Sequence, residues 1–214
     1  EMCHYLLDKG ALRQREDGYV WMSPDGALGV PDSVTGIIEA RLGELSQEAS
    51  DVIQRASVVG QNFWLGALGD ASRNSTVLDE LVEREFIRSN HASQIPNERE
   101  YAFTSSLVRE TIRSSLPENR RRLIHSGVCD WLETLTIANN LEIQMFLAAH
   151  QRLAGRLREA FLTARSAANL AFEQASFLTA ARVYEFCDKI QPSSSIFDVF
   201  RTYGQQGEVH ERVA

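Results

Sequence analysis

The chain lacks the short motifs that mark self-contained enzymes. Its 214 residues include no GxxxxGKS/T phosphate loop, no GxGxxG after an expected strand, no GxSxG elbow and no HExxH zinc motif. The five histidines are scattered, with no pair at the spacing of metal ligands. We therefore expect that this chain is not an enzyme by itself and that it holds no metal and no cofactor.

Cysteines and long apolar runs are also scarce. Cys3, Cys129 and Cys187 lie far apart without a CxxC pair, which predicts free buried thiols in a reducing compartment. No apolar run approaches the roughly 18 residues that span a bilayer, and no signal peptide opens the sequence. We expect a cytoplasmic protein with no membrane partner.

An excess of positive charge is absent too. The 22 basic and 29 acidic side chains give a net charge of -7, which argues against a chain whose main role is to hold nucleic acid. Residues 1–7 look like the middle of a helix and residues 207–214 like the start of one. The sequence therefore predicts a piece cut from a larger protein.

Helix and strand signals alternate in the first half of the chain. A short helix is expected over about 1–9, and strands at 11–15 and 19–22 flank the hairpin turn Glu16-Asp17-Gly18. Asp32 or Ser33 can cap a helix that runs to about Leu45, and Ser46 can cap a second helix that ends at Gly60.

A third, short helix is expected around Phe63, Trp64, Leu65 and Leu68, and a fourth runs from Thr76 to Glu85. Residues 86–89 and 100–103 then alternate like two strands joined by a polar loop. Three helices followed by a two-stranded wing predict a winged helix-turn-helix domain.

Beyond the wing, we expect helices almost to the end, near 105–115, 118–135, 140–153, 156–174 and 177–190. Within them a ladder of small, aromatic and proline positions is typical of a 34-residue tetratricopeptide repeat. A generic alanine-rich hairpin is the alternative. The ladder consists of Ala168, Ala180, Tyr184, Cys187 and Pro192.

These patterns predict a mainly α protein in three parts. Residues 1–30 are interpreted as a helix and hairpin, 31–135 as a winged-helix domain with linking helices, and 136–214 as truncated helical repeats of tetratricopeptide type.

The helix in the DNA-recognition position is acidic. It carries Asp79, Glu80, Glu83 and Glu85 against Arg84 alone, whereas a DNA-reading helix needs side chains for base edges and phosphates. The wing adds Arg88 and Arg99 but also Glu98 and Glu100. We therefore expect the helix to dock on protein, and a DNA-binding winged-helix regulator is the alternative.

Basic side chains gather on two consecutive helices, opposed by Glu110 and Glu118. One interpretation is a contact for an anion or a nucleotide phosphate, and the other is a solvated face with local salt bridges. The residues concerned are Arg109, Arg113, Arg120, Arg121, Arg122 and His125.

Several segments resemble the region that follows the nucleotide-binding core in bacterial STAND-type AAA ATPases. Such ATPases occur in class III adenylate or guanylate cyclases and in LuxR-type transcriptional regulators. The similar segments are Val30-Pro31-Asp32-Ser33-Val34, Ile38-Glu39-Ala40-Arg41-Leu42, Ala56-Ser57-Val58-Val59-Gly60 with Phe63-Trp64, Tyr101-Ala102-Phe103, Leu107-Val108-Arg109-Glu110 and Arg120-Arg121-Arg122-Leu123-Ile124-His125. Residues 1–10 resemble the end of the ATPase lid.

The resemblance implies a non-catalytic regulatory segment of a signal-transduction ATPase. Its winged helix would pack on a nucleotide-binding core absent from this chain, where the parent binds ATP or ADP, and its repeats would bind a protein or small-molecule effector. In that family a histidine, a plausible nucleotide sensor, usually precedes the Leu-Val-Arg helix. Here Ser105 stands in that sensor position.

Overall fold

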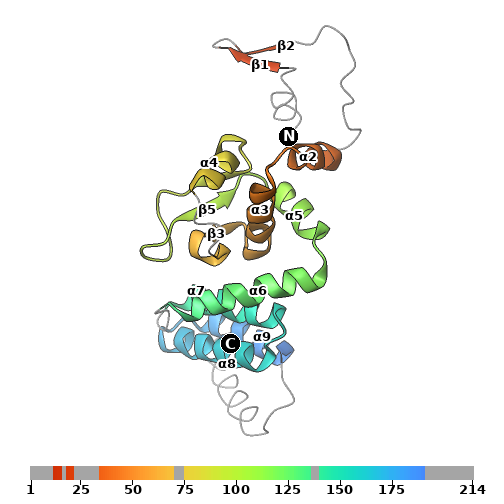
Figure 1. Cartoon of the computed structure of the whole chain (residues 1–214). Coiled ribbons are helices and arrows are strands. Elements are labelled where there is room, and N and C mark those ends of the chain that lie inside the picture. The colour runs from red at the N-terminus through yellow and green to blue at the C-terminus, as the bar shows by residue number, and fades with distance from the viewer. Residues whose placement is uncertain (1–11, 16–17, 22–33, 70–74, 136–139, 191–214) are drawn as a thin grey trace. The chain divides into compact units, whose positions relative to one another are not determined.

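The computed structural model describes residues 12–15, 18–21, 34–69, 75–135 and 140–190. The protein is mainly helical, as expected, with two small antiparallel sheets (Figure 1). The chain divides into two compact units, residues 1–117 and 118–214. Within the described ranges, no helix combines the length and the apolar character needed to cross a membrane.

The first sheet is the hairpin expected around Asp17-Gly18. Strand β1 (Leu12–Arg15) pairs antiparallel with β2 (Gly18–Trp21), with Leu12 opposite Trp21 and Arg15 opposite Gly18. The helix expected over 1–9 lies outside the described residues.

Two helices begin the remainder of the first unit. Helix α2 (Val34–Leu42) is followed by α3 (Gln47–Val59), whose N-cap Ser46 accepts a hydrogen bond from the backbone of Ala49 through its side chain. Gly60 is the C-cap of α3. Both predicted ends of α3 are confirmed, because capping depends on neighbouring residues that the sequence shows directly.

The segment after α3 corrects one expectation. Asn62–Trp64 form strand β3, and only Leu65–Leu68 turn into a short 3-10 helix, η1. The expected helix is therefore wrong for Phe63 and Trp64. Phe63 pairs with Tyr101 and stacks on it at 5.8 Å between ring centroids. Aromatic residues suit a half-buried pleated surface, and the partner strand lies too far along the chain for local periodicity to reveal it.

Helix α4 (Ser75–Glu83) leads into β4 (Ile87–Ser89), β5 (Glu100–Phe103) and α5 (Ser106–Ser115). The three-stranded sheet has the order β3-β5-β4, with both pairs antiparallel. Helix α3 packs against α4, α5 and η1. The core between them contains Ile53, Phe63, Leu78, Leu81, Phe86 and Phe103, each at most 2% exposed.

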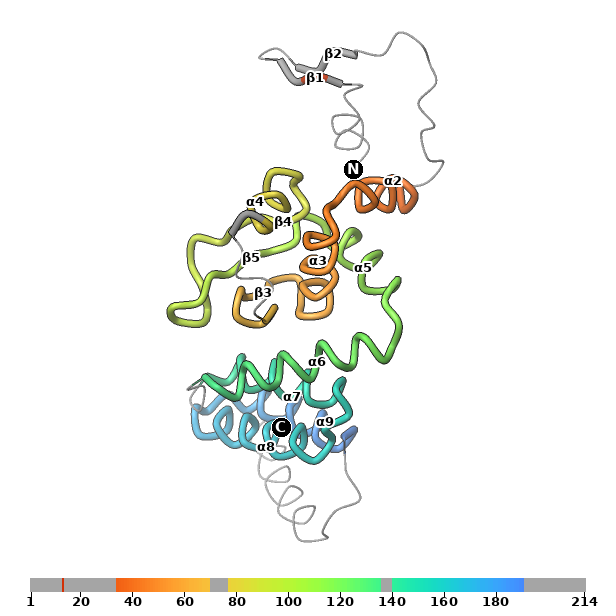
Figure 2. Tube along the Cα trace, in the orientation of Figure 1, coloured from red at the N-terminus to blue at the C-terminus, as the bar shows by residue number. Residues whose placement is uncertain are grey.

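The second unit is a series of antiparallel helices. The ends predicted from the sequence for these helices agree with the observed ends to within two residues. The helices are α6 (Glu118–Glu133), α7 (Leu141–Leu153), α8 (Leu157–Glu173) and α9 (Phe177–Ile190). Each packs against the next in sequence (Figure 2). Helix α6 belongs to this unit, whereas the sequence predicts residues 118–135 as part of the segment 31–135, the winged-helix domain with its linking helices.

Candidate functional site

The exposed face of α4 is acidic. Asp79 and Glu83 are exposed, beside Val82 at 37% exposure, and the described helix contains no lysine or arginine. Its apolar side, with Val77, Leu78 and Leu81, is buried. A surface of this sign repels phosphate and favours a cationic partner.

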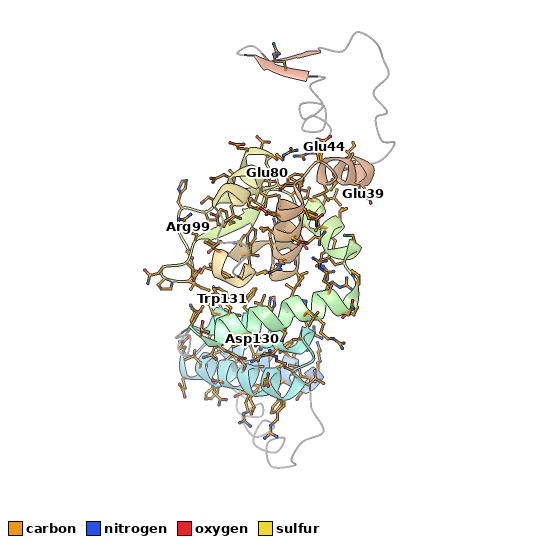
Figure 3. The ribbon with its side chains drawn as sticks, in the orientation of Figure 1. Glu39, Glu44, Glu80, Arg99, Asp130 and Trp131 are labelled. Atoms are coloured by element: carbon orange, nitrogen blue, oxygen red, sulfur yellow. The ribbon has the colours of Figure 1, made fainter. Side chains whose placement is uncertain are left out.

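Arg84, which directly follows α4, is engaged in ion pairs. Its guanidinium lies 3.8 Å from Glu44 and 3.7 Å from Glu80, and both acids are labelled in Figure 3. Its backbone carbonyl accepts a 2.6 Å hydrogen bond from buried Arg41. Arg84 therefore joins α4 to the α2–α3 corner and leaves the acidic face unneutralised.

The β4–β5 segment, which the sequence predicts as a wing, differs in how it exposes its basic and acidic side chains. Arg88 and Arg99 are exposed, whereas the carboxylate of Glu100 is buried and accepts from the side chains of Asn62 and Asn90 and from the backbone of Gln94. Glu98 accepts a hydrogen bond from the Gly66 backbone. Both acids are engaged in hydrogen bonds within this segment and to its neighbours, so the exposed charge of the β4–β5 segment is more basic than the sequence count indicates.

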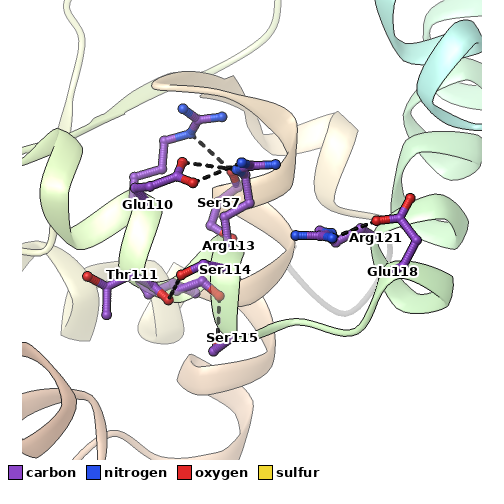
Figure 4. Close-up of polar contacts among 10 residues, drawn as sticks. Ser57, Glu110, Thr111, Arg113, Ser114, Ser115, Glu118 and Arg121 are labelled. Atoms are coloured by element: carbon purple, nitrogen blue, oxygen red, sulfur yellow. Dashed lines mark hydrogen bonds and ion pairs between the residues drawn. The ribbon is translucent and has the colours of Figure 1, made fainter. Parts of the chain in front are cut away.

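Two of the expected anion-contact residues, Arg109 and Arg113, belong to the first unit. The Nε of Arg109 donates to the Ser57 carbonyl at 3.0 Å and so links α5 to α3. Arg113 pairs with Glu110, with nitrogen–oxygen distances of 2.8 and 3.0 Å (Figure 4). Half-burial lowers the pKa of the Arg109 guanidinium, the nearby charge of Arg113 lowers it further, and Glu110 opposes both.

Arg120, Arg121 and Arg122 begin the second unit, on the first turn of α6. Arg121 donates to Glu118 at 2.6 Å (Figure 4), and this bond is the main cause that lowers the pKa of the Glu118 carboxyl. Arg120 and Arg122 are exposed. Both Arg113 and Arg121 thus take part in the local salt bridges of the solvated-face interpretation, and the six expected residues are divided between two units.

His125 is buried and faces another histidine. Its Nδ1 lies 3.0 Å from the Nδ1 of His150 on α7, and the two rings meet edge to face at 4.8 Å between centroids. Phe146 covers His150 at 4.4 Å. The sequence predicts His125 on a basic surface, either as an anion contact or on a solvated face, whereas it is buried in a contact within the α6–α7 interface.

Ser105, at the expected sensor position, is the N-cap of α5. Its Oγ accepts a hydrogen bond from the Val108 backbone at 3.4 Å. The neighbouring Thr104 donates its hydroxyl to the carbonyls of Glu85 and Phe86. Both side chains thus serve the junction between α4, β5 and α5.

The small-residue ladder lies inside the second unit. Ala168, Ala180, Tyr184 and Cys187 are each at most 1% exposed, and the Tyr184 hydroxyl donates to Asn169 at 2.7 Å. Burial raises the pKa of the Cys129 and Cys187 thiols to about 12, and both are free, as expected. Pro192 and Cys3 lie outside the described residues.

The second unit contains a pocket of about 290 Å³ that the sequence does not predict, lined by residues of α7 and α9 and by Ala164 of α8. Its side chains come from three separate helices, and only the alanine content of residues 156–190 could have indicated room there.

Across the described ranges, no group of three or more His, Cys, Asp or Glu side chains could hold a metal ion. The chain matches no protein-family model, no curated protein and no solved structure.

Proposed function

We propose that this chain is a non-catalytic regulatory segment of a signal-transduction ATPase. In this proposal, a winged-helix domain docks on the nucleotide-binding core of the same protein through α4. The helical repeats then couple the binding of an effector to that core. The acidic exposed face of α4 is the observation that carries the proposal.

The order of elements supports a winged helix in the first unit. Helix α3, strand β3, η1, helix α4 and strands β4 and β5 follow one another, and the sheet order β3-β5-β4 places the last strand in the centre. In this arrangement α4 has the position of the recognition helix and the loop between β4 and β5 is the wing.

The charge of α4 favours docking on protein. Asp79 and Glu83 are exposed and Val82 lies between them in sequence, so the face combines carboxylates with an apolar contact. A complementary partner presents Lys or Arg around an apolar patch, and such complementarity sets orientation and specificity. A DNA duplex offers the opposite sign.

The second unit supports the role of a repeat array. Helices α7, α8 and α9 are joined by connections of three residues each and pack in sequence order. The buried positions Ala168, Ala180, Tyr184 and Cys187 fit the spacing of a tetratricopeptide repeat. Arrays of this kind offer extended surfaces for ligands and partners.

A DNA-binding regulator is the second candidate, and the exposed Arg88 and Arg99 of the wing favour it. A wing can contact phosphate while another element faces protein. The two candidates predict opposite behaviour with duplex DNA, because phosphate contacts produce affinity that falls steeply as salt rises.

The test reverses the charge of α4 in the longer protein that contains the ATPase core. We expect Asp79→Lys with Glu83→Lys to change effector-dependent ATP turnover about tenfold, within the usual range of coupling between sites. Glu39→Lys with Glu173→Lys, which reverses two exposed acids on α2 and α8, should leave turnover unchanged.

Two results would overturn the proposal. One is equal turnover in the α4 variant and its control. The other is salt-dependent binding of the unaltered segment to duplex DNA, measured by fluorescence anisotropy, with loss of that binding in Arg88→Gln and Arg99→Gln. The isolated segment should hydrolyse no ATP.

A further inference from the structure

A half-open pocket lies in the second unit between α7 and α9. Its volume is about 290 Å³. Ala148 of α7, Ala164 of α8 and Val183 of α9 line it and are each at most 1% exposed. The space exists because two of these three buried positions hold alanine, whereas larger side chains would close the gap between the helices.

The sides of the pocket are apolar and adaptable. Met145 and Ala149 line it from α7, and Phe186 lines it from α9. Met145 is 36% exposed, and the unbranched thioether of methionine adjusts to ligands of different shape. The pocket therefore suits the aliphatic part of a ligand, which gains free energy by leaving water.

Two cations stand on the α9 side. Arg182 and Lys189 line the pocket and are exposed, seven residues apart, so about 10 Å separates them along the helix axis. Neither forms an ion pair with a described residue, and none of the described lining residues is acidic. Arg152 lies 5.7 Å over the Phe186 ring and adds a third positive charge nearby.

The charged side chains that line the pocket are both cations, although the net charge of the whole chain is -7 and Glu185 and Asp188 lie on the same helix outside the lining. A mainly apolar cavity whose charged lining residues are Arg182 and Lys189 favours a ligand that has an apolar body and an anionic end. The volume of about 290 Å³ lies just below the range of about 300–1,000 Å³ for small-molecule pockets. That size fits a short aliphatic chain and is too small for a helix of a partner protein.

We propose that the pocket binds a medium-chain aliphatic carboxylate. Its alkyl chain lies between Met145, Ala149 and Phe186, and its carboxylate meets Arg182 or Lys189. Because α7 and α9 both contact this ligand, binding holds the two helices in one arrangement. The inference rests on the proposed function, since it names the effector class for the helical unit.

Calorimetric titration of the full chain with decanoate, below its micelle concentration, tests the ligand. We expect saturable binding, with decanol and a decyl trimethylammonium ion at least about tenfold weaker, because a charge-assisted hydrogen bond distinguishes the acid from both. Equal binding of decanol and decanoate would overturn the assignment of the cations.

Two variants test the site, each with a matched control. Arg182→Gln with Lys189→Gln should weaken decanoate about tenfold, whereas Arg122→Gln with Arg158→Gln, at exposed arginines of α6 and α8 outside the pocket, should not. Ala149→Leu should occlude the cavity and weaken decanoate similarly, whereas Ser166→Leu adds a leucine on an exposed part of α8. Circular dichroism of each variant verifies its fold. If Ala149→Leu unfolds, the variant Arg182→Gln with Lys189→Gln still tests the site, because it changes only exposed side chains.

The outcomes separate the ligand from the regulatory role. Absence of decanoate binding overturns the ligand class, and so does binding of an acidic peptide in its place when Ala149→Leu abolishes that binding. Decanoate binding that depends on Arg182 and Lys189 supports the pocket. If ATP turnover of the longer protein then fails to respond to decanoate, the regulatory function is overturned while the binding site stands.

Discussion

Single arginine residues link distant segments of the first unit, because their guanidinium groups donate hydrogen bonds to backbone carbonyls. Arg41 is 1% exposed, donates to the Arg84 carbonyl and lies 4.6 Å over the Phe86 ring, while Arg109 donates to Ser57. Their acceptors lie 43 and 52 residues away in the chain. Sequence spacing placed Arg109 with Arg113 on one helix face, but it could not reveal a carbonyl partner on another helix.

The pair of buried imidazoles is another contact that local sequence could not show. His125 and His150 stand 25 residues apart and meet through their Nδ1 atoms. A hydrogen bond between two such atoms requires one ring to donate and the other to accept. The pair therefore fixes complementary tautomers across the α6–α7 interface, where the sequence indicated only a basic surface.

Alkaline pH should destabilise the fold through Cys129 and Cys187. Burial raises the pKa of both thiols to about 12, whereas the pKa of a thiol in the unfolded chain is about 8.5. Above about pH 8.5 the thiols of the unfolded chain lose protons that the folded chain retains, which favours unfolding. The stability that is present below this pH is therefore lost progressively as the pH rises toward 12. The expected slope is about 1.4 kcal/mol per pH unit for each thiol.

Urea unfolding of the wild type and of Cys129→Ala with Cys187→Ala, followed between pH 8 and 10.5, measures this effect. The difference in unfolding free energy between the two proteins should shift with pH, because other titrating groups are common to both. A pH-independent difference would contradict protected thiols.

At the scale of elements, the α7–α8 turn and the α8–α9 turn have the same geometry but different residues. Gly155 and Ala175 both adopt positive φ, at 84° and 57°. In each turn the next backbone N–H bonds back to a carbonyl five residues earlier, from Arg156 to Gln151 and from Ser176 to Ala171. These are Schellman caps, which favour glycine at the left-handed position.

Exchanging the residues of the two caps should shift stability in opposite directions. Gly155→Ala should destabilise by about 1 kcal/mol, since a Cβ there meets no atom within 4 Å and only the backbone conformation opposes it. Ala175→Gly should stabilise by roughly 0.5 kcal/mol, because relief of strain exceeds the added freedom of the unfolded chain. Thermal and urea unfolding of both variants test this, and a loss of stability in Ala175→Gly would refute the assignment.

Among the elements of the fold, the helices were the most predictable from the sequence. Ser46 and Gly60 limit α3, and the helices of the second unit follow their apolar period and punctuation. Strand β3 was missed because Phe63 and Trp64 are strand residues only through pairing with β5, nearly 40 residues later. The pocket was missed for a similar reason, since three helices contribute to it and no local pattern joins them.

For the whole molecule, each compact unit has its own core. Ile53 is 1% exposed within the first unit, and Ile143 is 4% exposed within the second. Truncating such a side chain costs about 2–5 kcal/mol. A unit that folds around its own core should lose protection without affecting the other.

Hydrogen exchange followed by mass spectrometry measures that independence. Ile53→Ala should raise exchange within 34–116 and leave 118–190 unchanged, and Ile143→Ala should do the reverse. A rise across the whole chain in either variant would show that the two units unfold together.

The order in which α6, α7, α8 and α9 pack has a mechanical consequence. Because the extensive contacts join helices that are consecutive in sequence, a tensile load along the array is borne by one interface after another. Under such a load, helices would detach from one end of the array one after another, each giving a small increase in length. The helices that remain packed would keep their structure until the load reached their own interface.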